Sequence, residues 1–145
     1  METDVGRSNK ELVRRYLREA YDKGKPELVD DYFAPEYVNH DPAPGLTPDR
    51  EGEKMLVAMF SEAFPDLEST VHEQIADGDL VFSRWTAVGT HKGPVMGVAP
   101  KGRRITMSGH EITRIRDGKV VEYWVNWDAA GFMRQLGAIP DAGGS

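Results

Sequence analysis

A glutamate among aromatic and aliphatic residues is the first candidate for chemistry. The stretch SGHEITRIRDGKVVEYWVNWDAAGFMRQLG, residues 108–137, is typical of two β-strands, a turn at Asp117-Gly118 and a short closing helix. Glu111 lies in the first strand. A carboxyl group that apolar neighbours shield from water has a raised pKa, and this suits it to exchange protons near neutral pH. Glu111 is therefore a candidate acid/base residue.

The loop length of this hairpin decides which residues share a face with Glu111. A strict two-residue loop, Asp117-Gly118, places Glu111 on the face of Trp124. Glu111 would then face solvent or pair with Arg104 or Arg114. A three-residue loop from Arg116, with Gly118 left-handed as a bulge, shifts the parity by one. One face then carries Glu111, Thr113, Tyr123, Val125 and Trp127, and the other carries His110, Ile112, Arg114, Glu122, Trp124 and Asn126. We adopt this second interpretation, because the basic and polar residues then collect on the more exposed face.

Length and composition indicate one globular domain. The chain has 145 residues, of which 39% are hydrophobic and 29% charged. The net charge of −6 and the lack of a Lys/Arg run argue against a nucleic-acid partner. There is no cysteine, which excludes disulfides and thiolate chemistry. No apolar run approaches the ~18 residues of a membrane helix, and the N-terminus lacks a signal-peptide core. We expect a cytoplasmic protein with no membrane partner.

The four histidines show no spacing typical of a metal site, so we expect no metal. His40-Asp41 stands in a proline-rich loop, where turn chemistry is the usual role. His91 follows Gly89-Thr90 at a strand end, where it is either a donor at a pocket mouth or a surface residue. His110 is expected at the surface or in an interface.

The order of predicted elements indicates an α+β fold with one covered sheet face. We expect a single domain, 1–145, with flexible ends at about 1–8 and 140–145. The predicted helices run from an Asn9 cap to Gly24, from Pro26 to Tyr32, from Pro48 or Asp49 to Pro65, and from an Asp128 cap to Gly137. The predicted strands are an edge segment at 34–41 and a meander over 67–75, 80–91, 104–115 and 120–127.

Several phrases in the chain resemble the SnoaL-like polyketide cyclase family of the nuclear-transport-factor-2-like superfold. They are Pro35-Glu36-Tyr37-Val38-Asn39, Ala63-Phe64-Pro65-Asp66-Leu67, Gly89-Thr90-His91, Asp117-Gly118-Lys119 and the ending Gln135-Leu136-Gly137. The resemblance implies a curved antiparallel sheet wrapped by N-terminal helices into a cone, the cystatin/nuclear-transport-factor-2-like α+β barrel, with an interior pocket. It also implies a hydrophobic small-molecule substrate and a homodimer formed through the outer face of the sheet.

The resemblance further implies cofactor-independent closure of the last ring of an aromatic polyketide by an intramolecular aldol step. In the family, an aspartate on the last long strand acts as acid/base and a histidine faces it from the neighbouring strand. The matching positions here are Val125 and Glu111, which is a departure from the family pattern. Valine cannot transfer a proton and glutamate can. We therefore expect the proton-transfer group to have moved to Glu111, within the same pocket.

Other site residues follow from the same resemblance. Tyr21 matches a tyrosine that positions substrate, Asn39 matches a polar residue near the pocket, and Leu56 stands where one cyclase has a polar residue. The expected catalytic residues are thus Glu111, Asn39 and Tyr21, and the expected pocket lining is Tyr37, Leu56, Met59, Trp85, His91, Tyr123, Val125 and Trp127.

Two other functions remain open at this point. The first is a non-catalytic binding or accessory protein that kept the pocket and lost the acid/base residue, which Val125 favours. The second is a limonene-type epoxide hydrolase, which needs Tyr-x-Asn and an Asp-Arg-Asp set. Tyr37 and Asn39 fit the first part, and Arg84 and Asp128 would have to supply the rest. That set is incomplete, because a threonine follows Trp85 where an aspartate is needed.

Overall fold

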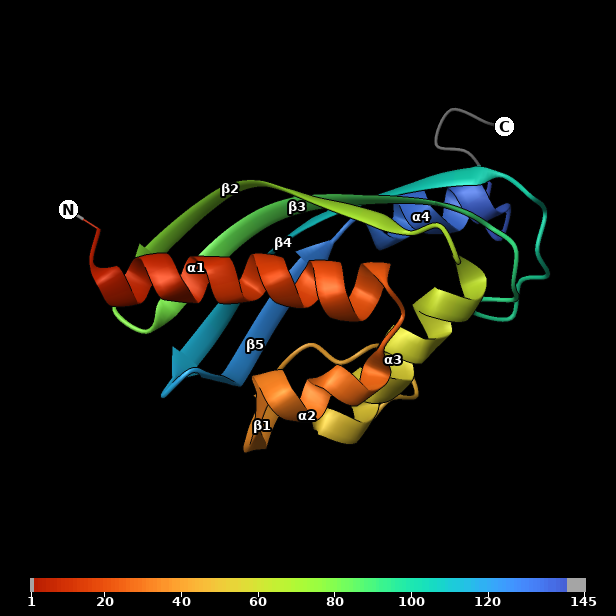
Figure 1. Cartoon of the computed structure of the whole chain (residues 1–145). Helices are drawn as coiled ribbons and strands as arrows, with labels where there is room; N and C mark the ends of the chain where they lie inside the picture. Colours follow the sequence, from red (N-terminus) through yellow and green to blue (C-terminus); the bar gives the residue numbers. More distant parts are fainter. Residues whose placement is uncertain (1, 141–145) are drawn as a thin grey trace.

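A computed structural model describes residues 2–140 of the chain (Figure 1). Its helices are α1 (Asp4–Tyr16), a π-helix (Leu17–Asp22), a 3₁₀ turn (Pro26–Leu28), α2 (Val29–Tyr32), α3 (Arg50–Ala63) and α4 (Ala129–Leu136). Its strands are β1 (Phe33–Asn39), β2 (Glu68–Asp77), β3 (Leu80–Thr90), β4 (Arg104–Arg116) and β5 (Lys119–Trp127). None of the helices described is long and apolar enough to span a membrane.

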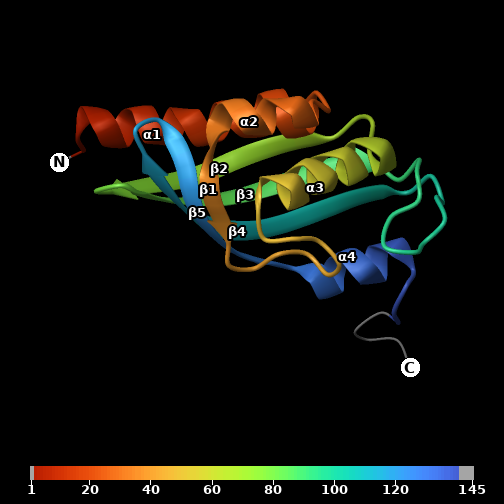
Figure 2. The ribbon, with the colours of Figure 1, turned by 90° about the horizontal axis from the view of Figure 1, so that it is seen from below.

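The strands form one curved, open sheet in the order β1-β5-β4-β3-β2. The pairs from β2 to β5 are antiparallel neighbours in sequence, which confirms the predicted meander. The edge strand β1 pairs parallel with β5. In Figure 1 the long strands arch over α1, and Figure 2 shows α3 in front of the sheet and β1 beside β5. The predicted α+β class, with helices covering one face of the sheet, is confirmed.

The first helix begins earlier than the sequence predicts. Thr3, not Asn9, is its N-cap, and the Thr3 hydroxyl accepts a hydrogen bond of 2.9 Å from the Gly6 amide. The predicted Asn9 cap is therefore wrong, and residues 4–8 belong to the helix. This first turn is almost entirely polar and its one large apolar residue, Val5, is exposed, so the apolar periodicity starts only at Leu12. The other predicted flexible end, beyond Pro140, lies outside the described residues.

The π-helix after α1 brings two tyrosines together. In an α-helix, residues five apart point about 140° away from each other. The wider i→i+5 turn over Leu17–Asp22 instead places Tyr16 and Tyr21 edge to face, with their ring centroids 5.8 Å apart. Both side chains can then reach the same point under α3.

The hairpin of β4 and β5 has the predicted faces but a different turn. Arg116 pairs with Lys119 across a two-residue turn, and both Asp117 (φ 51°) and Gly118 (φ 74°) are left-handed, as in a type I′ turn. The predicted three-residue loop is therefore wrong. Ile115 then pairs with Val120, while Arg114 pairs with Glu122. The extra residue between these two β5 partners is a bulge, and it shifts the parity by one.

Candidate active site

A cavity of about 660 Å³ opens between the concave face of the sheet and the helices. This volume is in the range of pockets that bind small organic molecules. Its wall is mostly apolar and draws on the π-helix, α3, β1 and strands β3 to β5, with the loop after β1 at its rim. The apolar lining includes Leu17, Phe33, Leu56, Phe60, Trp85 and Met107.

The structure brings most of the predicted site residues to this cavity. Those that line it are Tyr21, Tyr37, Asn39, Leu56, Trp85, Glu111, Tyr123, Val125 and Trp127. Glu111 and Val125 are direct cross-strand partners, as the resemblance implied for the two family positions. Leu56 enters from α3.

Two predicted lining residues, Met59 and His91, lie outside the cavity wall. The prediction for Met59 is wrong, because α3 directs three other residues at helical spacing, Glu53, Leu56 and Phe60, towards the cavity. His91 is fully buried, 5.9 Å from the Phe64 ring, so it is neither at a pocket mouth nor on the surface. The amide of the next residue, Lys92, bonds to the Ala63 carbonyl and holds this segment against the end of α3.

Glu111 points into the cavity and is only 6% exposed. The Thr113 hydroxyl donates to its Oε2 at 3.1 Å. Burial raises the pKa of Glu111 to about 8, and the nearby charge of Glu53 adds to the effect. The alternative ion pair with Arg114 does not form, because that guanidinium binds Asp79 and Glu122 on the opposite face of the sheet.

A second buried carboxyl, Glu53, was not among the predicted site residues. It lies in the first turn of α3, is 7% exposed and lines the cavity. The hydroxyls of Tyr16 and Tyr21 both donate to its Oε2, that of Tyr21 at 3.0 Å. Burial raises the pKa of Glu53 to about 7, although the two hydrogen bonds oppose the rise. A glutamate in the first turn of a helix usually interacts favourably with the helix dipole. In the sequence, only the spacing of Glu53 to Leu56 and Phe60 indicates an inward side chain.

The cavity has unused hydrogen-bond donors and no cation. Among residues 2–140, no Lys, Arg or His lines it. The Tyr37 hydroxyl and the Trp85 indole nitrogen are buried there without a partner in the described protein. Burial, followed by the charges of Glu53 and Glu111, raises the pKa of Tyr37 far above its usual value, so its hydroxyl stays a neutral donor. Buried donors without acceptors are expected to meet oxygens of a ligand.

The segment after β1 closes the rim of the cavity through backbone contacts. Asn39 Oδ1 accepts from the Asp41 amide at 2.8 Å, and Asp41 Oδ2 accepts from the Val125 amide at 2.9 Å. The His40 ring stacks on Trp124 and its Nε2 lies 2.9 Å from Glu122. The turn chemistry expected of His40-Asp41 is thus present, with Asp41 tying the rim to β5.

The residues needed for epoxide hydrolysis are not brought together. Arg84 pairs with Glu73 at 2.7 Å and does not line the cavity. Asp128 caps α4, where its Oδ1 accepts from the Gly131 amide at 2.9 Å. Neither reaches Tyr37 and Asn39. Over the described range, no group of three or more His, Cys, Asp or Glu side chains is arranged to hold a metal ion.

Comparisons with known proteins agree with this geometry. Residues 11–136 match the model of the family described as SnoaL-like polyketide cyclase. The aklanonic acid methyl ester cyclase AcmA of Streptomyces galilaeus is 36% identical over 134 residues, which cover 86% of this chain and 88% of that protein. The nogalonic acid methyl ester cyclase of Streptomyces nogalater is 31% identical over 125 residues, with 81% and 90% covered. The structure of TsrD from Streptomyces laurentii superposes with a TM-score of 0.83 at 31% identity, over 95% of this chain and all of that one (100%). The chain therefore belongs to the SnoaL-like polyketide cyclase family.

Proposed function

We propose that the protein is a cyclase that needs no cofactor and closes a ring in a hydrophobic, polyketide-like ester by an intramolecular aldol step. One observation carries the proposal. Glu111, a carboxyl with a pKa raised to about 8, faces a cavity of about 660 Å³ directly opposite Val125. A proton-transfer group thus stands at the strand pair where the family resemblance implies one.

The aldol step defines what the residues must do. A proton leaves the carbon next to a carbonyl, the resulting enolate carbon bonds to a ketone carbon, and the ketone oxygen takes up a proton. No atom is lost, so the product has the mass of the substrate. The step needs a proton-transfer group and donors for the developing oxyanion. Glu111 supplies the first, and the free donors of Tyr37 and Trp85 supply the second.

The charge in the cavity favours an uncharged substrate. Three carboxyls line it, Asp41 at the rim and Glu53 and Glu111 inside, and the described wall contains no cation, so a substrate carboxylate would be buried without a partner. The relatives AcmA and the Streptomyces nogalater cyclase are named for acid methyl esters, in which that carboxylate is masked. We propose the same ester class for this chain. Tyr21 and Asn39 position it, and Leu56, Tyr123, Val125 and Trp127 shape its site.

A binding or accessory role is the second candidate, because Val125 removes the family's acid/base aspartate. The two functions differ in whether a bound ester is converted. Purified protein is incubated with aklanonic acid methyl ester and with nogalonic acid methyl ester, and the products are separated by liquid chromatography with mass detection. A cyclase yields a product of unchanged mass with a new ring, whereas a binding protein returns the ester.

The matched variants in this assay are Glu111→Gln and Glu122→Gln. They make the same substitution on opposite faces of one hairpin. We expect Glu111→Gln to lower turnover by about 10²- to 10⁴-fold and Glu122→Gln to leave it near wild type. Unchanged turnover in Glu111→Gln would remove Glu111 from the mechanism.

A further inference from the structure

We propose that Glu53 and Glu111 work as a two-carboxyl acid/base pair, in which Glu53 takes the proton from carbon and Glu111 gives a proton to the new alkoxide. The pair deepens the proposed function and rests on it. It suits the aldol step, in which a base takes a proton from carbon and an acid delivers a proton to oxygen.

The described part of the cavity wall offers no cation to either carboxyl. Both carboxyls line the same cavity, and the charge of Glu53 acts on Glu111. No Lys, Arg or His of the described wall is present to neutralise them. Two like charges in a dry cavity are costly, so one carboxyl keeps its proton while the other ionises. The pair therefore holds an acid and a base at the same time.

The arrangement of hydrogen-bond donors decides which carboxyl ionises. Two phenol hydroxyls, those of Tyr16 and Tyr21, donate to Glu53 Oε2 and stabilise its anion. Glu111 has one donor, the Thr113 hydroxyl at 3.1 Å. The negative charge therefore belongs on Glu53 and the proton on Glu111.

The π-helix builds this arrangement of donors. An α-helix would turn Tyr16 and Tyr21 about 140° apart, whereas here both reach one carboxylate oxygen. π-Helical turns are rare and are found frequently at functional sites. Both phenols bond Oε2, and Oε1 of Glu53 has no hydrogen bond from any described residue, which leaves it for the substrate.

Two tyrosines that line the cavity, Tyr37 and Tyr123, are affected by the charges of both carboxyls. The charges of Glu53 and Glu111 both raise the pKa of Tyr37 and of Tyr123, after burial, and Asp41 adds to the effect on Tyr123. Tyr37 lines the same cavity as both carboxyls, and its hydroxyl has no partner in the described protein. It can hold the substrate oxygen that gains negative charge.

The reaction then balances. Glu53 takes the proton, and the electrons of the broken C–H bond form the enolate. The enolate carbon bonds to the ketone carbon, the carbonyl π electrons move to the ketone oxygen, and that oxygen takes the proton of Glu111. The step ends with Glu53 protonated and Glu111 ionised. After product release, a proton returns from Glu53 to Glu111 through entering water.

The test separates the two proton transfers. Aklanonic acid methyl ester is incubated in D₂O, with exchange of its α-proton followed by NMR and ring closure by chromatography. We expect Glu53→Gln to lower both by about 100-fold or more. Glu111→Gln, which removes only the acid, should lose ring closure by a similar factor and keep exchange within about tenfold of wild type. The outer-face control Glu122→Gln should change neither.

Two variants guard against a purely structural role for the Tyr-Glu-Tyr cluster. Tyr21→Phe and Tyr16→Phe each remove one donor from Glu53 and keep both carboxyls. Carbon-detected NMR of the side-chain carboxyls should show Glu53 ionising before Glu111 in the wild type, and ionising at higher pH in each variant. The acidic limb of the pH profile of the exchange rate should shift to higher pH together with the ionisation of Glu53. A cluster with only a structural role would leave this limb at the same pH as in the wild type.

The proposal is overturned if Glu111 ionises first in the free protein, or if Glu53→Gln exchanges the α-proton as fast as wild type. Wild-type protein that neither exchanges nor cyclises the ester would instead overturn the proposed function. In that case the carboxyl titration of the free protein still decides the ionisation order of the pair.

Discussion

At the scale of single residues, burial determines the pH range in which the two buried carboxyls of the cavity, Glu53 and Glu111, exchange protons. Glu53 and Glu111 are each less than one-tenth exposed, and for both the largest cause of the raised pKa is desolvation. A carboxyl with an ordinary pKa would be fully ionised at neutral pH and a weak base. Raising the pKa to about 7 or 8 makes each group able both to hold and to release a proton in that range.

The same shifts predict how stability depends on pH. Between the usual glutamate pKa of 4.5 and the raised values, the folded protein binds protons that the unfolded chain has released. The unfolding free energy therefore falls as pH rises, by about 1.4 kcal/mol per pH unit for each group between about 5 and 7, and for Glu111 alone from there towards 8. Urea unfolding at pH 5, 6, 7 and 8 measures this slope. Glu111→Gln should make it shallower, and a stability that rises with pH would contradict the assignment.

A second prediction concerns the position opposite Glu111. Val125→Asp restores the residue type that the family resemblance implies there, beside a carboxyl on the paired strand. The added negative charge should raise the pKa of Glu111 further. Because the rest of the cavity is intact, we expect turnover of the methyl ester to increase. Val125→Asn is the control, with the same shape and no charge. A loss of turnover in both variants would show that Val125 is needed as an apolar wall, and a loss in the aspartate variant alone would show that the added charge is harmful.

The sequence predicted Glu111 and missed Glu53, and the reason is physical. Glu111 stands in a strand, where alternation assigns a face once the hairpin parity is chosen. Glu53 stands in the first turn of a helix, where acidic residues are ordinary. Its partners Tyr16 and Tyr21 reach it only through a π-helix, and no local pattern of residue types predicted that turn.

At the scale of elements, the hairpin of β4 and β5 has the predicted faces for a different reason. The bulge on β5 supplies the one-residue shift that we had assigned to the loop. The alternation of side chains along a strand reflects the sum of such one-residue shifts, and it does not show whether each one lies in the turn or in a bulge. Hydrophobic patterning therefore predicted the inward face of Glu111 correctly, while the turn itself needed backbone angles that the sequence does not contain.

The type I′ turn can be tested directly. Gly118 is left-handed, and a side chain added there would meet nothing within 4 Å, so the cost of Gly118→Ala is that of the backbone alone. We expect a loss of about 1–2 kcal/mol in unfolding free energy by urea denaturation. Asp117→Asn, which tolerates the same conformation well, should be neutral or slightly stabilising. An alanine variant as stable as wild type would argue against the left-handed turn.

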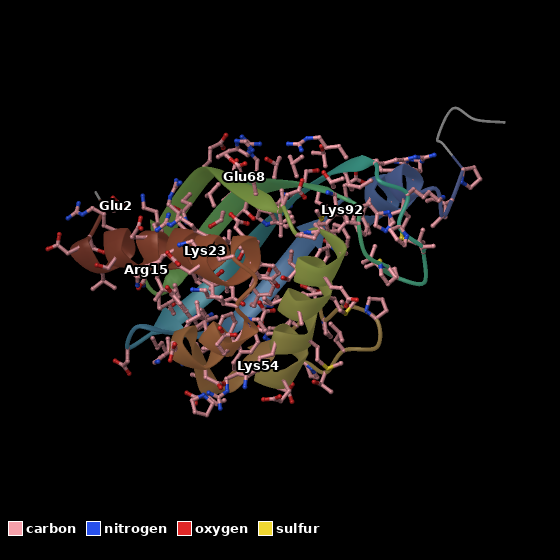
Figure 3. The ribbon with its side chains drawn as sticks, turned by 45° about the vertical axis from the view of Figure 1, so that its right-hand side comes forward. Glu2, Arg15, Lys23, Lys54, Glu68 and Lys92 are labelled. Carbon is pink, nitrogen blue, oxygen red and sulfur yellow. The ribbon has the colours of Figure 1, made fainter. Side chains whose placement is uncertain are left out.

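At the scale of the whole molecule, the fold separates an apolar interior from a charged exterior. The charged side chains labelled in Figure 3, among them Arg15, Lys23 and Lys54, lie on the outside of the helices and loops. Family phrases spread along the chain made the overall architecture predictable. These phrases could not predict how close α3 lies to the concave face of the sheet, because that distance depends on packing between elements far apart in the sequence.

The outer face of the sheet carries an apolar row that crosses four strands. Register places Ile75 beside Phe82, Phe82 beside Ile112, and Ile112 beside Trp124. Ile75 is 66% exposed and Ile112 is 39% exposed. A continuous apolar row on an exposed sheet face is typical of a surface that another molecule covers. We propose a second copy of this chain as that molecule, as the family resemblance implies.

A single substitution tests the dimer. Ile112 follows Glu111 on β4 and points to the opposite face, so Ile112→Glu places a charge in the middle of the row without entering the cavity. We expect sedimentation velocity at micromolar concentration to show a dimer for wild type and a monomer for this variant, because an unpaired charge buried between two sheets is costly. Val5→Glu, on exposed α1, is the control and should stay dimeric. If the wild type is monomeric, the apolar row must bind a partner other than a second copy.

The apolar row and the cavity lie on opposite faces of the same strands. The monomeric variant should therefore keep its turnover of the ester, and this separates assembly from catalysis.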